Sequence, residues 1–137
     1  IGDNVVVANN GSIGGHVTIS DNVIVGGLAG IHQFCRVGEG AMIGAVTMVS
    51  KDVIPFGVVV GDRCSLNGIN LIGLKRRGFS NKKILELQKD FNSLFHGDGN
   101  LKDKAEKIYK TNGKDLINII AAFILADTSR KITTPIN

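Results

Sequence analysis

The sequence lacks tryptophan and has only two prolines and two cysteines among its 137 residues. Two cysteines, Cys35 and Cys64, cannot supply the disulfide framework of a small secreted domain, and such sparse use fits a reducing compartment. No secretory signal peptide is expected. The longest apolar run, 116–126, contains Asn118 and falls short of the ~20 residues that cross a bilayer, so it indicates a buried helix. These absences predict a cytoplasmic protein without a membrane span.

What the sequence has in abundance is glycine, 18 residues, in a chain that is 43% hydrophobic. High glycine with few prolines and aromatics favours a fold with many tight corners over disorder. Residues 1–65 carry three basic and five acidic residues, whereas 66–137 carry thirteen basic and seven acidic residues. The second part can therefore meet an anionic partner, although a solvated lysine-rich helical surface explains the charge equally well. Nucleic acid is not expected, because no exposed aromatics alternate with the basic residues.

An aliphatic residue recurs every six positions from residue 1. Nine consecutive hexads begin with Ile or Val, and many continue with Gly; their first residues are Ile1, Val7, Ile13, Ile19, Val25, Ile31, Val37, Ile43 and Val49. The fifth positions hold Val5, Gly11, Val17, Val23, Ala29, Cys35, Ala41, Thr47 and Val53. Neither an α-helix nor a simple strand requires a period of six, which instead fits one side of a β-solenoid coil.

The hexads resemble those of the left-handed parallel β-helix of hexapeptide acyltransferases. In that fold three hexads form one triangular coil, so residues 18 apart stack, and adjacent coils lie ~4.8 Å apart. First and fifth positions point inward, which makes Cys35 a small core residue and not a nucleophile. We therefore predict a mainly β protein.

The third position of each hexad falls at a corner of the triangle and distinguishes its three edges. One edge carries Asp3, Asp21 and Glu39; a second carries Asn9, Gly27 and Ala45; the third carries Gly15, Gln33 and Lys51. His16 follows Gly15, and His32 precedes Gln33 on the next coil. Both histidines flank the third edge and point outward, so we expect their side chains within ~10 Å of each other.

The hexads end at Pro55, and a small helical domain is expected beyond them. Residues 55–72 have no clear period and are predicted to be an irregular closing segment. Helices are predicted over 81–96, where Ser80 can cap the first turn, over 101–111 and over 114–127, and the tail 131–137 is expected to be extended or frayed. The predicted domains are thus 1–72, the β-helix coils with their closing segment, and 73–137, a helical cap.

Two clusters could carry chemistry. His16 and His32 could act as a general base, as part of a metal site, or as plain surface residues. A metal site is the weakest of the three, because a third ligand is missing near that edge. The other cluster is the basic run Lys75–Arg77 between Gly73 and Gly78, expected in a loop, where arginines could bind phosphate.

Three segments in order carry a specific family resemblance: GGHV at 14–17, GGLAGIHQFCRVG at 26–38 and NLIGLKRRGFS at 70–80. They are similar to the acyl-ACP–UDP-N-acetylglucosamine O-acyltransferases, which act first in lipid A synthesis, and the likeness covers essentially the whole chain. The resemblance implies a homotrimer with active sites between neighbouring β-helices. It implies transfer of a 3-hydroxyacyl group to the glucosamine 3-hydroxyl, with no cofactor, because the donor acyl chain is carried on the phosphopantetheine of acyl carrier protein. No metal is implied.

The resemblance also assigns roles near the third edge. Gly15 matches the glycine whose backbone N–H stabilises the thioester oxyanion, and His16 matches a substrate-binding histidine beside it, which could serve as an auxiliary base. His32 and Gln33 match residues that line the donor and sugar-nucleotide pocket.

Further roles fall elsewhere in the chain. Asn70, Arg76 and Arg77 match the segment that contacts the nucleotide diphosphate, and Ala45 matches the position that limits acyl-chain length. Acyl carrier protein is strongly acidic, so docking is expected on basic side chains of the second part: Lys75, Lys82, Lys83 and Lys89.

The family's catalytic base histidine corresponds to a position four residues upstream of Ile1. We therefore expect this chain to be inactive, or nearly so, on its own. The alternatives are another hexapeptide acyltransferase, either N-acyl or CoA-dependent acetyl, and a non-catalytic trimeric β-prism that serves assembly or binding.

Overall fold

The computed structural model describes residues 1–111, 115–126 and 130–136, and its contacts divide the chain into two compact units. One unit consists of Ile1–Asn70 and the C-terminal tail, and the other begins at Leu71. The tail therefore belongs with the coils, whereas the sequence pattern alone grouped it with the helices.

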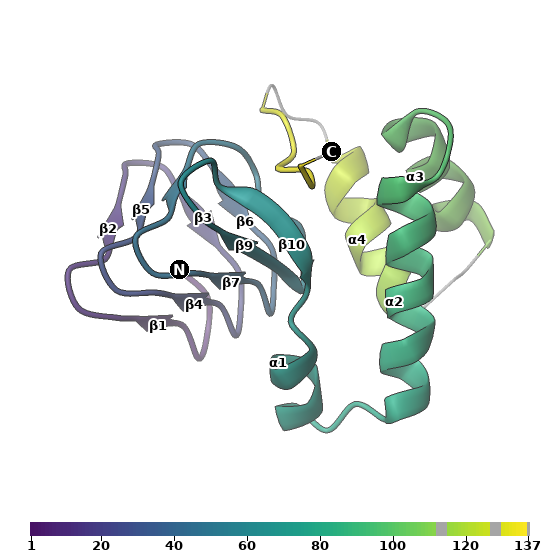
Figure 1. The fold of residues 1–137 in the computed structure, drawn as a ribbon, viewed down its shortest axis with the longest axis horizontal. Helices are drawn as coiled ribbons and strands as arrows, with labels where there is room; N and C mark the ends of the chain where they lie inside the picture. Colours follow the sequence, from purple (N-terminus) through teal and green to yellow (C-terminus); the bar gives the residue numbers. More distant parts are fainter. Residues whose placement is uncertain (112–114, 127–129, 137) are drawn as a thin grey trace. The chain divides into compact units, whose positions relative to one another are not determined.

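The first unit is the predicted left-handed parallel β-helix, built from two-residue strands joined by turns (Figure 1). The short strands are β1 (Val6–Val7), β2 (Ser12–Ile13), β3 (Thr18–Ile19), β4 (Ile24–Val25), β5 (Gly30–Ile31), β6 (Arg36–Val37), β7 (Met42–Ile43) and β8 (Met48–Val49). Two longer strands, β9 (Gly57–Val60) and β10 (Ser65–Ile69), close the unit.

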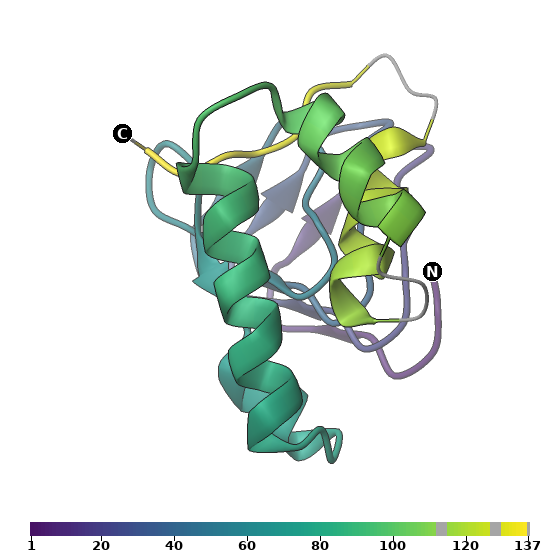
Figure 2. The same ribbon diagram turned by 90° about the vertical axis from the view of Figure 1, so that its right-hand side faces the viewer.

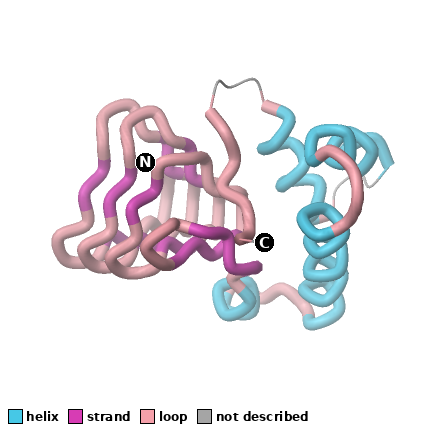
Figure 3. Tube along the Cα trace, turned by 45° about the horizontal axis from the view of Figure 1, so that its top comes forward, coloured by secondary structure: helices cyan, strands magenta, loops and turns pink. Residues whose placement is uncertain are grey.

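Strands 18 residues apart pair in parallel, so each strand stacks on the one a coil earlier (Figure 3). Val7 pairs with Val25 and Val25 with Ile43, and the three faces form sheets ordered β1-β4-β7-β9-β10, β2-β5-β8 and β3-β6. The hexad period thus becomes a register that repeats every three hexads, as predicted.

The core lies inside the coils, at the first and fifth hexad positions. Beyond the first coil these side chains are buried, including Val25, Ile31, Cys35 and Val37, whereas Ile1 at the open end is 79% exposed. Burial raises the pKa of the Cys35 thiol, which keeps it protonated and poorly nucleophilic. The prediction that Cys35 is a small core residue is confirmed.

The corners require a left-handed backbone at the fourth position of eight successive hexads. Asn4, Asn10, His16, Asn22, Leu28, Phe34, Gly40 and Val46 all have φ between 56° and 67°. Asparagine and glycine tolerate this conformation, but leucine, phenylalanine and valine pay an energetic penalty of roughly 1–2 kcal/mol each. From Asn22 onward, the fourth-position N–H donates to the third-position carbonyl of the preceding coil, as from Phe34 to Gly15 at 3.0 Å.

The regular register ends between Val49 and Val53. Val37 pairs with Val53, sixteen residues later instead of eighteen, so Lys51 does not continue the column of Gly15 and Gln33. The prediction that residues 55–72 form an irregular closing segment is also wrong, because β9 and β10 form an antiparallel pair. The valine-rich run of β9 and the glycine at Gly61 in a left-handed turn (φ 87°) explain this hairpin.

The shortened coil is held by a buried carboxylate. Asp52 is 0% exposed, and its Oδ1 and Oδ2 accept from the backbone N–H and the Nε of Arg36, both at 2.8 Å. Its own backbone pairs with the tail: Asp52 N–H donates to the carbonyl of Lys131 at 2.9 Å, and Thr133 N–H donates to the carbonyl of Asp52 at 2.8 Å. The tail, expected to be extended or frayed, is extended and paired.

The described part of the second unit contains four helices: α1 (Leu71–Arg76), α2 (Asn81–His96), α3 (Leu101–Thr111) and α4 (Leu116–Leu125). Within it α4 packs against α2 and α3, and α1 contacts α2 (Figure 2). The bounds predicted for α2 and α3 are confirmed, as is the Ser80 cap, whose hydroxyl accepts from Lys83 N–H at 3.2 Å. The third predicted helix is shorter than 114–127, whose two end residues lie outside the described residues. No helix of the described ranges has the length and apolar character to cross a membrane.

The helix α1 was not predicted, because Gly73 and Gly78 suggested a loop. Gly78 instead ends the helix in a left-handed conformation (φ 88°), with its N–H donating to the carbonyl of Lys75 and Phe79 N–H donating to that of Leu74. This pair of hydrogen bonds is the pattern of a Schellman cap. Lys75 and Arg76 therefore lie in the last turn of a helix, where positive charge is favoured by the helix dipole, and Arg77 directly follows that turn.

Replacing Asp52 with alanine should destabilise the chain by about 2–4 kcal/mol, because it leaves the Arg36 N–H groups without their acceptor and loosens the tail. Asp21→Ala is the matched control, since Asp21 also accepts a neighbouring coil's N–H, from Asp3 at 2.7 Å, but at an exposed corner. Its cost should stay below about 1 kcal/mol. Urea denaturation measures both, and equal losses would contradict the importance of the buried site.

Candidate active site

The predicted third edge exists and brings together parts of two consecutive coils. The turn between β2 and β3 carries Gly15 and His16, and the turn between β5 and β6 carries His32 and Gln33. Pairing of Ile13 with Ile31 and of Thr18 with Arg36 places Gly15 opposite Gln33. Both histidines therefore flank one corner, as the hexad pattern predicted.

His16 is fixed by an aromatic neighbour that the sequence pattern did not single out. Its ring stacks on that of Phe34 with centroids 4.9 Å apart and planes 5° from parallel. The two residues occupy the fourth hexad position on successive coils and share the left-handed corner conformation, with φ of 59° and 67°. The signal was present in the sequence, because Phe34 lies eighteen residues after His16.

His32 is held by the backbone and by the tail. Its Nδ1 lies 3.2 Å from the carbonyl oxygen of Gln33 and 3.3 Å from a guanidinium nitrogen of Arg130. The His32 side chain is exposed, and its backbone N–H is used in the coil ladder, donating to the carbonyl of Val49 at 2.8 Å. Nothing in the sequence pattern pointed to Arg130, which is almost a hundred residues away along the chain.

Gly15 offers a backbone N–H at a corner with free space around it. Its carbonyl accepts from Phe34, and within the described residues its N–H has no acceptor. A Cβ built on Gly15 would meet nothing within 4 Å. A developing negative charge could therefore approach this N–H closely, although other third-position residues share the free N–H, so geometry alone does not single out Gly15.

Gly14 has the opposite environment. A Cβ at Gly14 would lie 2.6 Å from the backbone nitrogen of Gln33 and 3.0 Å from the carbonyl oxygen of Ile31. Glycine is therefore required at Gly14 to let two coils stack, but not at Gly15.

Two other predicted site residues lie on different edges of the same unit. Ala45 is exposed on the second edge, stacked closely over Gly26, whose added Cβ would meet Ala45 N at 2.5 Å. Asn70 is 8% exposed; its Nδ2 donates to the carbonyl of Gly40 at 3.2 Å and its N–H to that of Phe56 at 2.7 Å. A single β-helix therefore does not bring Ala45 or Asn70 to the corner of Gly15.

Arg76 and Arg77 lie in the second unit, at the end of α1. Arg77 N–H donates to the carbonyl of Gly73 at 3.1 Å, and its guanidinium carbon lies 5.3 Å from the centroid of the Phe79 ring. Such a contact restrains the orientation of the guanidinium.

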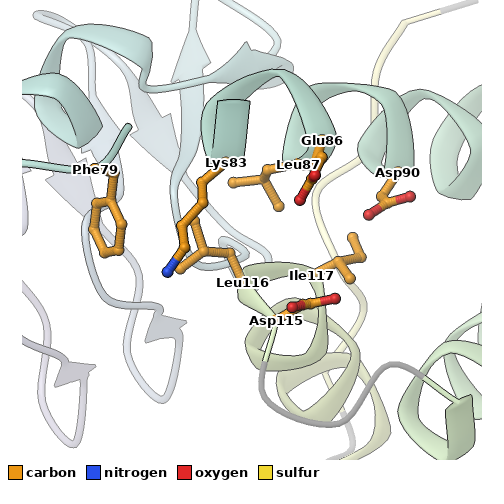
Figure 4. A pocket seen from close by; sticks show the side chains of 8 residues that line it. All are labelled: Phe79, Lys83, Glu86, Leu87, Asp90, Asp115, Leu116 and Ile117. Carbon is orange, nitrogen blue, oxygen red and sulfur yellow. The ribbon is translucent and has the colours of Figure 1, made fainter. Parts of the chain in front are cut away.

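The helical unit has a cavity of about 170 Å³ that the sequence did not predict (Figure 4). It lies where α2 meets the start of α4, and it is lined by Phe79, Lys83, Glu86, Leu87, Asp90, Asp115, Leu116 and Ile117. Burial, followed by the charges of Asp115 and Glu86, raises the pKa of the Asp90 carboxyl, while Lys89 partly opposes this. The side chains converge only when the two helices pack, so no local sequence signal marks them. Across residues 1–111, 115–126 and 130–136 no three metal-ligating side chains gather.

A family model described as UDP N-acetylglucosamine O-acyltransferase, domain 2, matches residues 52–133. Among curated proteins, an acyl-[acyl-carrier-protein]–UDP-N-acetylglucosamine O-acyltransferase of Paracoccus denitrificans is 47% identical over 98% of this chain and 51% of its own length. The protein of the same name from Campylobacter concisus is 38% identical over 93% of this chain and 48% of its own length. The chain thus spans about half the length of these relatives.

Solved structures give the same likeness. A UDP-N-acetylglucosamine acyltransferase from Francisella novicida superposes with a TM-score of 0.90 at 30% identity, covering 100% of this chain and 50% of that one. The Arabidopsis UDP-N-acetylglucosamine acyltransferase superposes with a TM-score of 0.87 at 28% identity, covering 98% and 50%.

The two neighbouring glycines at the corner should respond oppositely to alanine. Gly14→Ala should cost about 1–3 kcal/mol, because its methyl group would overlap the backbone of the next coil. Gly15→Ala should change stability by less than about 1 kcal/mol, since its methyl group enters open space. Thermal denaturation of both variants tests this, and a large loss for Gly15→Ala would show that the corner is more crowded than described.

Proposed function

Because the chain belongs to the UDP N-acetylglucosamine O-acyltransferase family, we propose that it supplies the C-terminal half of an enzyme of lipid A synthesis. The reaction transfers a 3-hydroxyacyl group from acyl carrier protein to the 3-hydroxyl of UDP-N-acetylglucosamine. The observation that supports it most directly is the corner at which Gly15 and His16 stack on Gln33 and Phe34. The enzyme works in the cytoplasm as a homotrimer.

In the proposed reaction the glucosamine hydroxyl oxygen attacks the thioester carbonyl while a histidine removes the hydroxyl proton. A C–O bond forms and the carbonyl π pair moves onto oxygen, where the Gly15 N–H donates to the oxyanion. Collapse of this intermediate breaks the C–S bond, and the thiolate of the carrier leaves and takes up the proton. The family places the base in the coil before Ile1, so His16 in this chain binds substrate.

The remaining residues bind the two substrates. His32 and Gln33 line the pocket for donor and sugar nucleotide, and Asn70 with Arg76 and Arg77 contacts the diphosphate. Arginine suits this role because its planar guanidinium pairs with two phosphate oxygens at once. Acyl carrier protein docks on exposed lysines of the helical unit: Lys75, Lys82, Lys83 and Lys89.

The test is acyl transfer from 3-hydroxyacyl carrier protein to UDP-N-acetylglucosamine, measured for the 137-residue chain and for a version extended upstream through the preceding coils. We expect activity only in the extended protein, and a reduction of about 100-fold or more when its base histidine is replaced. Activity of both forms, lost in His16→Ala, would instead make His16 the base. A folded extended protein that transfers nothing to this acceptor would favour a related hexapeptide acyltransferase or a scaffold.

Ala45 should shorten the acyl pocket. In the extended protein, Ala45→Gly removes one methyl group and should shift preference toward longer donors by about fourfold per added CH₂, from ~0.8 kcal/mol of apolar burial. Gly27→Ala is the control, because it adds a methyl one coil earlier on the same edge with only an ordinary 3.6 Å contact to Asn9. Competition between donors of different length measures the ratio, and an unchanged preference in Ala45→Gly would refute the assignment.

A further inference from the structure

Among the residues that the structure describes, the β-helix corner at Gln33 lacks its usual backbone hydrogen bond. The third-position carbonyls of Asp3, Asn9, Gly15, Asp21 and Gly27 all accept from the backbone N–H nineteen residues later. At Gln33 the partner would be Asp52, but the shortened coil turns Asp52 away, and its N–H donates to Lys131. The Gln33 carbonyl, at the corner that carries His32, therefore receives no hydrogen bond from the backbone of the next coil.

The side chain of Arg130 fills this gap. One guanidinium nitrogen donates to the Gln33 carbonyl at 2.7 Å and also lies 3.3 Å from Nδ1 of His32, and the other donates to the Ser50 carbonyl at 3.0 Å. Arg130 thus replaces a missing backbone donor and reaches the imidazole with the same nitrogen.

The tail is well anchored where it delivers Arg130. The Lys131 carbonyl accepts a hydrogen bond from Asp52 N–H, and Thr133 N–H donates to the Asp52 carbonyl. The Asp52 carboxylate in turn accepts hydrogen bonds from Arg36. Thr133 is 3% exposed. The guanidinium is therefore presented from an anchored extended segment and not from a loose end.

We propose that Arg130 is a positioning residue that sets the tautomer of His32. An arginine N–H can only donate, so Nδ1 of His32 must accept, and the single proton of the neutral ring resides on Nε2. Without Arg130, Nδ1 would be free to take the proton and donate to the Gln33 carbonyl, which lies 3.2 Å away. The Nε2–H then becomes a hydrogen-bond donor toward oxygen atoms of a substrate, a role that rests on the proposed function.

The tautomer can be measured without any activity. Nitrogen-15 and proton correlation spectra of the histidine rings, recorded at mildly alkaline pH, distinguish the two neutral forms. The chain has three histidines, so His16→Gln and His96→Gln variants assign the His32 signals. We expect the Nε2–H form in the unmodified chain, a clear Nδ1–H population in Arg130→Met, and retention of the Nε2–H form in Arg130→Lys, which keeps a donor.

Lys131→Met is the matched control, because it removes the adjacent positive charge of the tail while its backbone bond to Asp52 remains. An Nδ1–H ring in the unmodified chain, or identical spectra for Arg130→Met and the unmodified chain, would overturn the proposal. The first of these outcomes is measured on the unmodified chain, so the proposal can be tested even if Arg130→Met fails to fold.

Activity of the extended protein gives a separate reading. Arg130→Met should lower kcat/KM by about three- to tenfold, the effect of one lost orienting hydrogen bond, with Lys131→Met unchanged. Failure of the proposed function would appear as absence of transfer by the unmodified extended protein, whatever the spectra show. A normal kcat/KM in Arg130→Met together with an unchanged tautomer would contradict the positioning role of Arg130 and leave the proposed function intact.

Discussion

The structure depends on one hydrogen-bond ladder, in which the backbone of each coil is satisfied by the coil 18 residues later. Two-residue strands could not stand alone, because each provides too few hydrogen bonds and buries too little surface. Stacking makes the ladder continuous and places the aliphatic first position inside every coil. The same ladder forces the fourth position into a left-handed conformation at each corner, so residues such as Leu28 and Val46 are held there by their neighbours and not by their own preference.

The candidate active site includes one corner that has the regular ladder hydrogen bond, at Gly15, and one that lacks it, at Gln33. Gly15 and His16 lie on a regular corner, so their backbone is fixed by Phe34. One coil later the register shortens by two residues, Gln33 loses its backbone donor, and the C-terminal tail provides a guanidinium in its place. A regular solenoid would have closed this corner with backbone alone. The irregularity places a charged side chain beside His32 at the edge where chemistry is expected.

Sequence predicted what is periodic or local. Nine aliphatic residues at period six determine the β-helix and its edges, and Ser80 marks the start of α2 because its hydroxyl can satisfy a helix N–H. It did not predict features that depend on distant segments meeting: the pairing of the tail with Asp52, the Arg130 contact, and the cavity between α2 and α4. The helix α1 was missed for another reason, because Gly73 lowers helix propensity and Gly78 serves as a cap that resembles a loop signal.

The corner at Gln33 is completed by a residue 97 positions later in the chain. On a ribosome that adds roughly 5–20 residues per second, the coils through Val53 can stack about 4–15 s before Arg130 has been synthesised. During that interval the Gln33 carbonyl lacks its guanidinium donor, and the His32 ring can adopt either tautomer. A stop codon placed between α4 and Arg130 would leave the nascent protein permanently in that state, so a truncation outside the coils would alter the active-site edge.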